Sequence, residues 1–285
     1  MENKRILVIG AAGYIGKDLV RTLSEKGYDI TLMLRKNPKN TNLSNYNYFI
    51  ADLLDKQTFS DKIKEFDIII NLASVVKAKN KSRYKENLLT MKNLIQSIEK
   101  SNKKPNLIHI STQNVNLKNK GPYATSKKQA EDILTKSKLG YTIIRPNYVY
   151  GIDKNNNFYK LAKTIKRYNL APIIGTGENK IQPILKQDLI DIVVNNIKTP
   201  KKNKIIEASG NQTISINNII SLISNYLKIN PKKIHINTKV LTIFKNFISF
   251  DIQGFTEDRI SKNPIKHTEK ITFEENLKKI INLLQ

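Results

Sequence analysis

A glycine-rich turn between a predicted strand and a predicted helix constrains the fold of this chain more than any other feature. Residues 5–9 are mostly apolar and branched, which is typical of a buried parallel strand. Residues 10–16 read G-A-A-G-Y-I-G and open an amphipathic segment. Gly10, Gly13 and Gly16 permit a tight turn, a close approach of the backbone to a pyrophosphate, and close packing of helix on strand. The turn therefore predicts a dinucleotide-binding unit.

Strands and helices alternate along the first half of the chain. Further buried strands are predicted at residues 28–34, 48–51, 67–73, 106–110 and 141–145, and helices at 57–66 and 83–100. This alternation implies right-handed crossovers and an α/β fold with an open, doubly wound parallel sheet of the Rossmann type. We expect residues 1–150 to form this dinucleotide-binding domain. We expect residues 151–285 to form mainly a smaller C-terminal substrate domain, with 204–210 returning to the sheet.

Several candidate binding residues fall where the predicted strands end, which is where open α/β sheets bind their ligands. They are Gly10, Arg35, Asp52, Ala73 and Thr112. An acidic residue at the end of the second strand would bind the ribose 2′-hydroxyl of NAD, whereas arginine suits a 2′-phosphate. The position of Arg35 therefore favours NADP(H), with NAD(H) remaining possible.

Tyr123 and Lys127 stand four residues apart at the start of a helical pattern, in the sequence G-P-Y-A-T-S-K. This spacing places both side chains on one face of a helix, about one turn apart. A neighbouring cation lowers the pKa of a phenol, so that such a pair suits proton transfer. A tyrosine–lysine pair at this spacing recurs by chance. A functional role is favoured here because the strand-end residues converge on the same region.

Composition limits the other classes of function. The chain carries 49 basic and 24 acidic residues, but the lysines are spread along its whole length, which argues against a nucleic-acid site. Cysteine is absent and the three histidines are far apart, so no metal site is predicted, and His109 is interpreted as a core residue. No apolar run reaches the length of a transmembrane segment. We expect a cytoplasmic protein, in which residues 240–250 form core, a lid, a dimer face or a membrane-surface helix.

The motifs, taken in order, resemble the extended short-chain dehydrogenase/reductase superfamily in its epimerase/dehydratase-like branch. Beside the glycine turn and Y-A-T-S-K, they are A-D-L-L-D, N-L-A-S, E-N-L-L-T-M-K-N-L-I, I-S-T and R-P-N-Y-V-Y-G. The resemblance covers essentially the whole chain. It implies that Tyr123 is the acid/base, that Lys127 holds the nicotinamide ribose, and that Thr112 orients the substrate carbonyl, with Ser111 as a substitute.

The resemblance also implies roles around the cofactor. Tyr14 and Ile15 would offer backbone amides to the pyrophosphate, Asp52 and Leu53 would meet adenine, and Ala73 would line the cleft. Asn87 matches a helix asparagine that supports the active site in relatives, although an ordinary helix-surface role is nearly as compatible with the sequence.

The second half resembles a substrate region for a nucleotide-linked sugar. Two departures stand out: the connection from Thr112 to Tyr123 is short, which leaves one wall of the substrate site missing or rebuilt, and Tyr148 stands where relatives often carry asparagine, with Asn147 preceding it. Lys180 lies near the position of a diphosphate-binding residue. Asp188 is expected to be the N-cap of a helix over 189–197.

These observations predict an NAD(P)-dependent oxidoreductase that reduces a keto group of a nucleotide-linked sugar, with a homodimer possible. Two alternatives remain open. One is an epimerase or dehydratase that retains NAD. The other is a non-catalytic NADP-binding accessory protein, because G-T-G-E-N-K-I-Q-P-I resembles relatives of an accessory subunit of respiratory complex I.

Overall fold

The computed structural model describes residues 4–39, 41–198, 203–237, 257–264 and 271–284. Within them, seven strands form one parallel sheet with the order β11-β6-β5-β4-β1-β2-β3. The strands are β1 (Arg5–Ile9), β2 (Asp29–Leu34), β3 (Asn47–Ile50), β4 (Ile68–Asn71), β5 (Asn106–Ile110), β6 (Tyr141–Pro146) and β11 (Lys204–Ala208). The chain winds outward from β1 to β3 and then crosses to β4 on the other side of β1. The doubly wound Rossmann sheet is confirmed.

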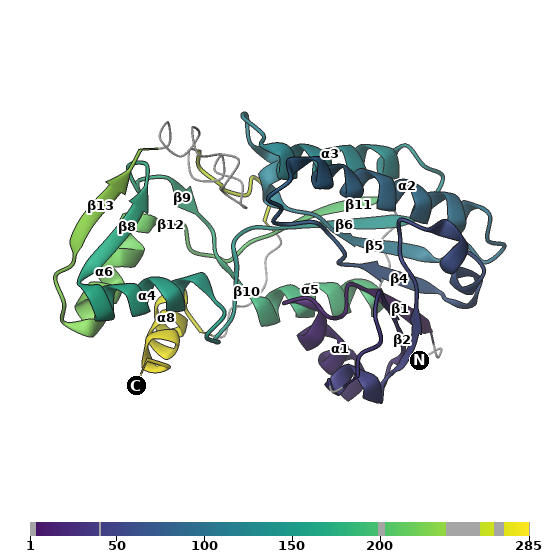
Figure 1. Ribbon diagram of the computed structural model, residues 1–285, viewed down its shortest axis with the longest axis horizontal. Helices are drawn as coiled ribbons and strands as arrows, with labels where there is room; N and C mark the ends of the chain where they lie inside the picture. Colours follow the sequence, from purple (N-terminus) through teal and green to yellow (C-terminus); the bar gives the residue numbers. More distant parts are fainter. Residues whose placement is uncertain (1–3, 40, 199–202, 238–256, 265–270, 285) are drawn as a thin grey trace.

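Helices cover both faces of this sheet (Figure 1). One face carries α1 (Gly16–Glu25) and α5 (Lys186–Lys198), and the other carries α2 (Lys85–Glu99) and α3 (Pro122–Thr135). Alternate strand residues enter the two core clusters: Ile6 and Val8 pack with α1 and α5, whereas Leu7 and Ile9 pack with α2 and α3. Because both faces are covered, the inner strands β1 and β4 are apolar and buried over most of their length, as parallel strands usually are.

A smaller unit lies beside the carboxyl ends of the strands (Figure 1). It contains α4 (Asn157–Tyr168), β8 (Leu170–Ile174), β9 (Lys180–Ile181), β12 (Ile214–Ser215), α6 (Ile216–Leu227), β13 (Lys232–Ile236) and α8 (Phe273–Asn282). Its core is a separate cluster that includes Phe158, Ile173, Ile219 and Leu277. Two short strands, β7 (Val149–Tyr150) and β10 (Ile184–Leu185), pair in parallel and connect this unit to the sheet. From this unit the chain returns to the sheet through α5 and β11, and the division into two domains at residue 150 stays a prediction.

The prediction of a helix over residues 57–66 is wrong. The structure has two short 3₁₀ turns there, η2 (Lys56–Thr58) and η3 (Lys62–Glu65). Thr58 Oγ1 donates to the Asp55 carbonyl over 2.7 Å, and Ser60 Oγ donates to the Lys56 carbonyl over 2.7 Å. Such side-chain hydroxyls compete with a continuous helix for backbone groups. The apolar spacing survives because Phe59, Ile63 and Phe66 are all buried.

Asp188 is not the N-cap that the sequence predicted, since α5 begins two residues earlier at Lys186. The Lys186 ammonium fixes this start, because it pairs with Asp18 over 2.5 Å and with Asp153 over 3.3 Å. Asp188 lies in the first turn instead, where a negative charge stabilises the helix dipole. The apolar stretch at 240–250 lies outside the described residues.

Candidate functional site

The glycine turn approaches the neighbouring strand end too closely for a side chain. Gly10 has φ +86°, and a Cβ placed on it would lie 2.8 Å from the backbone nitrogen of Ala73, which follows β4. A Cβ on Gly16 would lie 2.3 Å from the Gly10 carbonyl oxygen. The glycines therefore hold the turn against α1 and against the end of β4, which is the point where the strand order reverses and where such sheets bind ligands.

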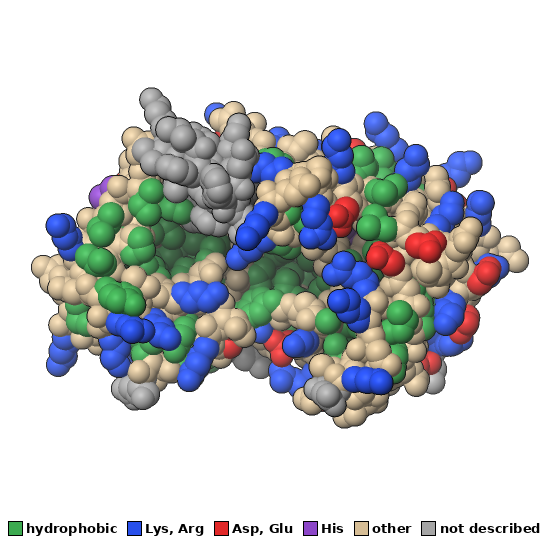
Figure 2. Space-filling view, in the orientation of Figure 1, with side chains coloured by type: hydrophobic (Ala, Val, Ile, Leu, Met, Phe, Trp, Pro, Cys, Tyr) green, Lys and Arg blue, Asp and Glu red, His purple; other side chains and the backbone are tan. Residues whose placement is uncertain are grey.

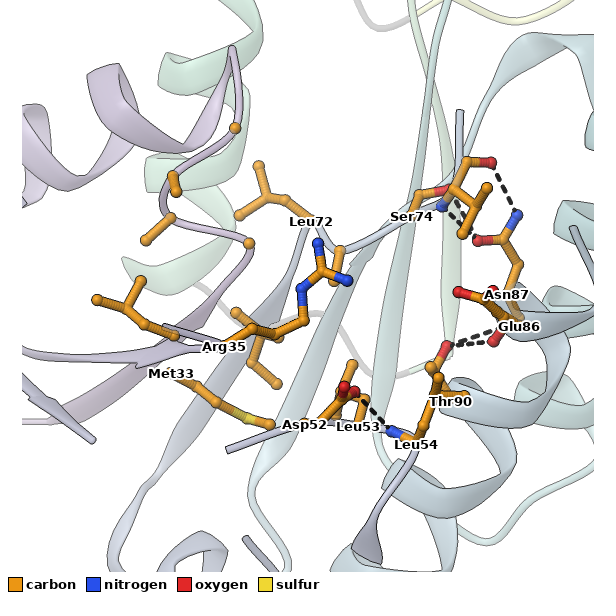
Figure 3. A pocket seen from close by; sticks show the side chains of 18 of the residues that line it. Met33, Arg35, Asp52, Leu53, Leu54, Leu72, Ser74, Glu86, Asn87 and Thr90 are labelled. Atoms are coloured by element: carbon orange, nitrogen blue, oxygen red, sulfur yellow. Dashed lines mark hydrogen bonds between the residues drawn. The ribbon is translucent and has the colours of Figure 1, made fainter. Parts of the chain in front are cut away.

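A cavity of about 500 Å³ opens over these strand ends (Figure 3). It brings together the carboxyl ends of β1, β2, β3 and β4 with the first turns of α2. The predicted binding residues that line it are Gly10, Gly13, Arg35, Asp52, Leu53 and Ala73, and the further residues include Met33, Ser74, Arg83, Glu86 and Asn87. Residues that the sequence predicted separately from four different strand ends therefore share one cavity.

Arg35 and Asp52 are the charged residues of this cavity that follow β2 and β3. The Arg35 side chain extends from the end of β2 into the cavity (Figure 3). Its guanidinium makes no hydrogen bond or ion pair within the part of the chain that the structure describes. The Asp52 carboxylate forms a local hydrogen bond, because its Oδ1 accepts from the Leu54 backbone over 3.0 Å. A guanidinium without an internal partner is available to a charged ligand, and it favours bidentate anions.

Asn87 connects the cavity to the helix that carries Tyr123. Its Oδ1 accepts from the Val75 backbone over 2.7 Å and from Ser74 Oγ over 3.2 Å. Its Nδ2 donates to the Val75 carbonyl over 3.2 Å and to Ser126 Oγ over 3.0 Å. Ser126 Oγ in turn donates to the Tyr123 carbonyl over 2.8 Å. Asn87 is buried and fully used, so it is not an ordinary helix-surface residue.

Thr112 and Ser111 lie directly after β5. Thr112 is the N-cap of the 3₁₀ turn η5 (Gln113–Asn116), and its Oγ1 accepts from the Asn114 backbone over 3.3 Å. Ser111 is buried, and its Oγ has no hydrogen-bond partner among the described residues. Both hydroxyls therefore lie at the carboxyl end of the sheet, and the Ser111 hydroxyl retains its full hydrogen-bonding capacity.

Tyr123 is the second residue of α3, which begins at Pro122, a residue favoured in the first turn of a helix. The ring is partly exposed, and its centroid lies 6.2 Å from that of the buried Tyr84 ring at an interplanar angle of 56°. The phenol is thus placed by aromatic packing on one side and by the Ser126 hydrogen bond to its own carbonyl on the other.

Lys127 lies one turn after Tyr123 on α3, but its ammonium is directed into the protein. Its Nζ donates to the Ile110 carbonyl over 2.8 Å and lies 3.1 Å from His109 Nε2. The residue is 1% exposed, and burial lowers its pKa from 10.5 to about 7, against the opposing effect of Glu131. Burial, together with the neighbouring Lys127 charge, also holds the pKa of His109 well below its usual range.

The side chain of Tyr14 links the glycine turn to the smaller unit. Its hydroxyl donates to Asp153 Oδ2 over 2.8 Å, and the Lys186 ammonium lies 4.0 Å from the centre of its ring. Burial and the Asp153 hydrogen bond raise the pKa of the Tyr14 phenol. The next residue, Ile15, packs against the core on the α1 side of the sheet. These contacts fix the turn, and no motif in the sequence indicates the contribution of the Tyr14 side chain.

The residues after β6 contact Arg259, which is distant in sequence. These contacts were not predicted from the sequence. Asn147 Nδ2 donates to the Arg259 carbonyl over 2.7 Å, and its Oδ1 accepts from the Tyr148 backbone over 2.9 Å. The Arg259 guanidinium lies 5.8 Å from the centre of the Tyr148 ring. Lys180 lies in β9 with its side chain exposed, and its backbone bonds to Asp258 and Arg259.

Figure 2 shows a hollow between the two units with hydrophobic side chains in it and with lysine and arginine side chains near its rim. No group of metal-ligating side chains occurs among the described residues. None of the described helices combines the length and the hydropathy that crossing a membrane requires.

The parallel sheet, the glycine turn at its switch point and the cavity beside it define a Rossmann-type α/β protein. The family model described as "NAD dependent epimerase/dehydratase family" matches residues 6–208. The chain belongs to this family, which confirms the resemblance found in its motifs.

Proteins of known function are similar to this chain in sequence or in fold. A UDP-glucose 4-epimerase from Vibrio cholerae is 25% identical over 240 residues, covering 74% of this chain and 72% of the relative. The structure of a UDP-glucose 4-epimerase with UDP-glucose from Thermotoga maritima matches with a TM-score of 0.75 and 18% identity, covering 98% of each chain. That of a dTDP-glucose 4,6-dehydratase with NAD from Bacillus anthracis matches with a TM-score of 0.73 and 17% identity, covering 99% of this chain and 96% of the other.

Proposed function

We propose that this protein is an NAD(P)-dependent enzyme that acts on a nucleotide-linked sugar, with epimerase or dehydratase chemistry and a retained cofactor. The observation that carries the proposal is the hydrogen-bonded path from the cavity through Asn87 and Ser126 to Tyr123. It joins the wall of the cavity beside the glycine turn to Tyr123, which with Lys127 forms a residue pair whose chemistry suits proton transfer. Membership of the epimerase/dehydratase family supports the same reading.

In this proposal the residues of the chain bind, orient and move one proton. The glycine turn and the ends of β2, β3 and β4 hold the dinucleotide, with Asp52 and Leu53 beside adenine. A bound nicotinamide supplies a hydride acceptor that can return the hydride later. Tyr123 takes the proton of a sugar hydroxyl when that carbon is oxidised and gives it back when the carbon is reduced. Thr112 hydrogen-bonds the sugar oxygen, with Ser111 as the adjacent donor.

Lys127 would serve this proton transfer through its positive charge. As a cation it would lower the pKa of the Tyr123 phenol and bind the nicotinamide ribose, as the family resemblance implies. In its observed position it is bonded to Ile110 and His109. The proposal therefore includes a rotation of the Lys127 side chain toward the ribose when the dinucleotide binds.

The family relationship favours a retained cofactor over the one-way reduction of a keto group that the sequence first suggested. The relatives are named as UDP-glucose 4-epimerases and a dTDP-glucose dehydratase. An epimerase oxidises and re-reduces the same substrate, so it consumes no reducing equivalents. Keto-group reduction remains the alternative within the enzyme class.

We further propose that the adenine ribose is recognised with a 2′-phosphate, so that NADP(H) is preferred to NAD(H). Arg35 supports this choice because it ends β2, extends into the cavity and has no internal partner among the described residues. The dTDP-glucose dehydratase of similar fold was crystallised with NAD. NAD(H) is therefore the competing cofactor in any measurement.

A non-catalytic cofactor-binding role is a second candidate. It is favoured by the inward position of Lys127 and by the use of the Asn147 amide for internal contacts. Its distinguishing property is a bound dinucleotide without turnover of any nucleotide sugar.

The experiment that tests the proposal has two parts. The purified protein is denatured and any released dinucleotide is identified. The native protein is then incubated with UDP-glucose and a panel of other nucleotide sugars, and the products are analysed by NMR. We expect an epimerised or dehydrated sugar nucleotide with no net consumption of added cofactor. Stoichiometric oxidation of NADPH would instead support the reductase, and a bound cofactor with no product would support the non-catalytic role.

A further inference from the structure

Residues 257–263 are bonded to both units and are here called the brace. The brace lies between the smaller unit and the start of α3 (Figure 1). On the side of the smaller unit, Asp258 Oδ1 accepts from the Lys180 backbone over 2.8 Å, and the Arg259 backbone donates to the Lys180 carbonyl over 2.8 Å. The Ser261 backbone donates to Gln182 Oε1 over 2.6 Å. These bonds attach the brace to β9 and the residue after it.

The brace is attached to the sheet as firmly as to the smaller unit. The Lys262 and Asn263 backbones donate to Glu207 Oε2 over 2.8 and 3.2 Å, and Glu207 belongs to β11. Ser261 Oγ is hydrogen-bonded to Ser209 Oγ, and both serines are buried. The brace therefore connects an element of the smaller unit to the edge strand of the sheet.

Glu257 extends this attachment to the loop that leads into α3. Its Oε2 accepts from the Lys118 backbone over 2.8 Å, and its Oε1 accepts from the Asn119 backbone over 2.8 Å. Hydrogen bonds to an ionised carboxylate are stronger than neutral ones. The Asn119 amide also holds the pKa of Glu257 below its usual range, so the carboxylate is charged at neutral pH. The anchored residues precede Tyr123 by only four and five positions.

An earlier part of the same loop is held by a second carboxylate. Asn116 Nδ2 donates to Glu207 Oε1 over 2.8 Å, while Arg145 donates to Asn116 Oδ1 over 3.1 Å. The Arg145 guanidinium is itself fixed by two hydrogen bonds from its Nε and one from its second terminal nitrogen to Glu131 on α3. The short connection from Thr112 to Tyr123 is therefore held at two places, at Asn116 by Glu207 of β11 and at the two residues 118–119 by Glu257 of the brace.

Asn147 connects the residues after β6 to the brace. Its side-chain amide is used to hold the brace, by donating to the Arg259 carbonyl. The brace then places the Arg259 guanidinium against the Tyr148 ring, at the position where relatives often carry asparagine. The altered residues after β6, the short connection before Tyr123 and the brace therefore form one arrangement.

We propose that Glu257 is a positioning residue that fixes the loop before α3, and with it Tyr123, relative to the smaller unit. This inference rests on the proposed function for its catalytic consequence. Its structural part, the anchoring of Lys118 and Asn119 by Glu257, is measurable without any substrate.

The test compares Glu257→Ala and Glu257→Gln with the unaltered protein. A matched control is Glu274→Ala, which removes an exposed carboxylate of α8 that accepts a hydrogen bond from the Tyr226 hydroxyl. Misplacing a reacting group by about 1 Å costs roughly 100-fold in rate. We expect kcat to fall by about 10- to 100-fold in Glu257→Ala and by less in Glu257→Gln, which keeps one acceptor oxygen. We expect the dissociation constant of the dinucleotide to stay within about twofold, because the brace does not line the cavity.

Amide hydrogen exchange provides the readout that a general loss of stability would not imitate. We expect exchange at Lys118 and Asn119 to accelerate by about tenfold or more in both Glu257 variants, with the β5 and β6 amides unchanged and the control unaffected. Unchanged exchange at these two amides would overturn the brace, whatever the activity. Faster exchange with an unchanged kcat in both variants would overturn the positioning role. If the unaltered protein turns over no nucleotide sugar, the proposed function fails, and the exchange measurement still decides whether Glu257 anchors the loop.

Discussion

Lys127 Nζ lies 3.1 Å from His109 Nε2 in the space between α3 and β5. Both side chains are almost completely buried, and the ammonium has the Ile110 carbonyl as its hydrogen-bond acceptor. Because burial brings the pKa of Lys127 to about 7, this residue is divided between its charged and neutral forms near neutral pH. The lysine that the sequence assigns to cofactor and phenol is thus a buried group whose pKa lies far below its usual value.

The first prediction concerns the pH dependence of stability. In the unfolded chain Lys127 titrates near ~10.4, whereas in the folded chain it titrates near 7. Between these values the unfolded state binds the extra proton, so stability rises with pH, by at most about 1.4 kcal/mol per pH unit for one group. We expect the free energy of unfolding to rise between about pH 7.5 and 9.5, which both lie between these two pKa values. This rise should be lost in Lys127→Met, and urea unfolding measures it.

The unaltered protein is the reference at each pH, since the many exposed lysines contribute equally to both proteins. Parallel pH dependences in the two proteins would show that Lys127 titrates normally, and the buried arrangement with His109 would then be wrong.

Asn87 supports a second prediction, because it uses both polar atoms to join the 74–75 loop to α3. Replacing it with leucine leaves buried partners without hydrogen bonds, and each such group costs about 1–3 kcal/mol. We expect Asn87→Leu to lower the free energy of unfolding by at least this amount and to weaken dinucleotide binding. Chemical denaturation and cofactor titration measure the two effects.

Asn218→Ala is the control, because Asn218 is exposed on α6 and its substitution should stay within about 0.5 kcal/mol. Equal stabilities of the Asn87 and Asn218 variants would mean that the Asn87 contacts carry no net energy.

Much of the fold was predictable because local patterns determine it. The inner strands of a sheet that is covered on both faces are mostly apolar. The glycine turn requires conformations and close contacts that other residues cannot provide, as at Gly10. Strand ends converge by topology alone, so Arg35, Asp52 and Ala73 could be assigned to one cavity before their positions were known.

The remaining features depend on contacts that are distant in sequence. The bonds from Glu257 to Lys118 and Asn119 span about half the chain, and no periodic pattern indicates them. The inward direction of Lys127 depends on His109 in a neighbouring strand. The broken helix at 57–66 was missed because its apolar spacing is helical, while its hydroxyl side chains bond back to the backbone.

Cofactor choice supplies a third prediction. A guanidinium at Arg35 can make charge-assisted hydrogen bonds to a 2′-phosphate, and bonds to charged groups contribute about 1.5–3 kcal/mol. We therefore expect NADP(H) to bind roughly ten- to a hundredfold more tightly than NAD(H), and Arg35→Ala to remove most of this difference while sparing NAD(H). Calorimetric titration of both cofactors into both proteins measures it.

Lys36→Ala is the matched control, since Lys36 is the next residue and is also exposed. Equal affinities of the unaltered protein for the two cofactors would show that Arg35 does not read the 2′-phosphate.

The central claim is that Tyr123 transfers the proton in a reaction on a nucleotide-linked sugar, and Tyr123→Phe tests it most directly. The substitution removes only the hydroxyl and keeps the ring that packs near Tyr84. General acid–base catalysis contributes about 100- to 10,000-fold, so turnover of the sugar nucleotide should fall by that factor while the dinucleotide binds as before. Tyr226→Phe, which removes a phenol bonded to Glu274 on the far side of the smaller unit's core, should keep full activity. Turnover by Tyr123→Phe at the rate of the unaltered protein would contradict the account.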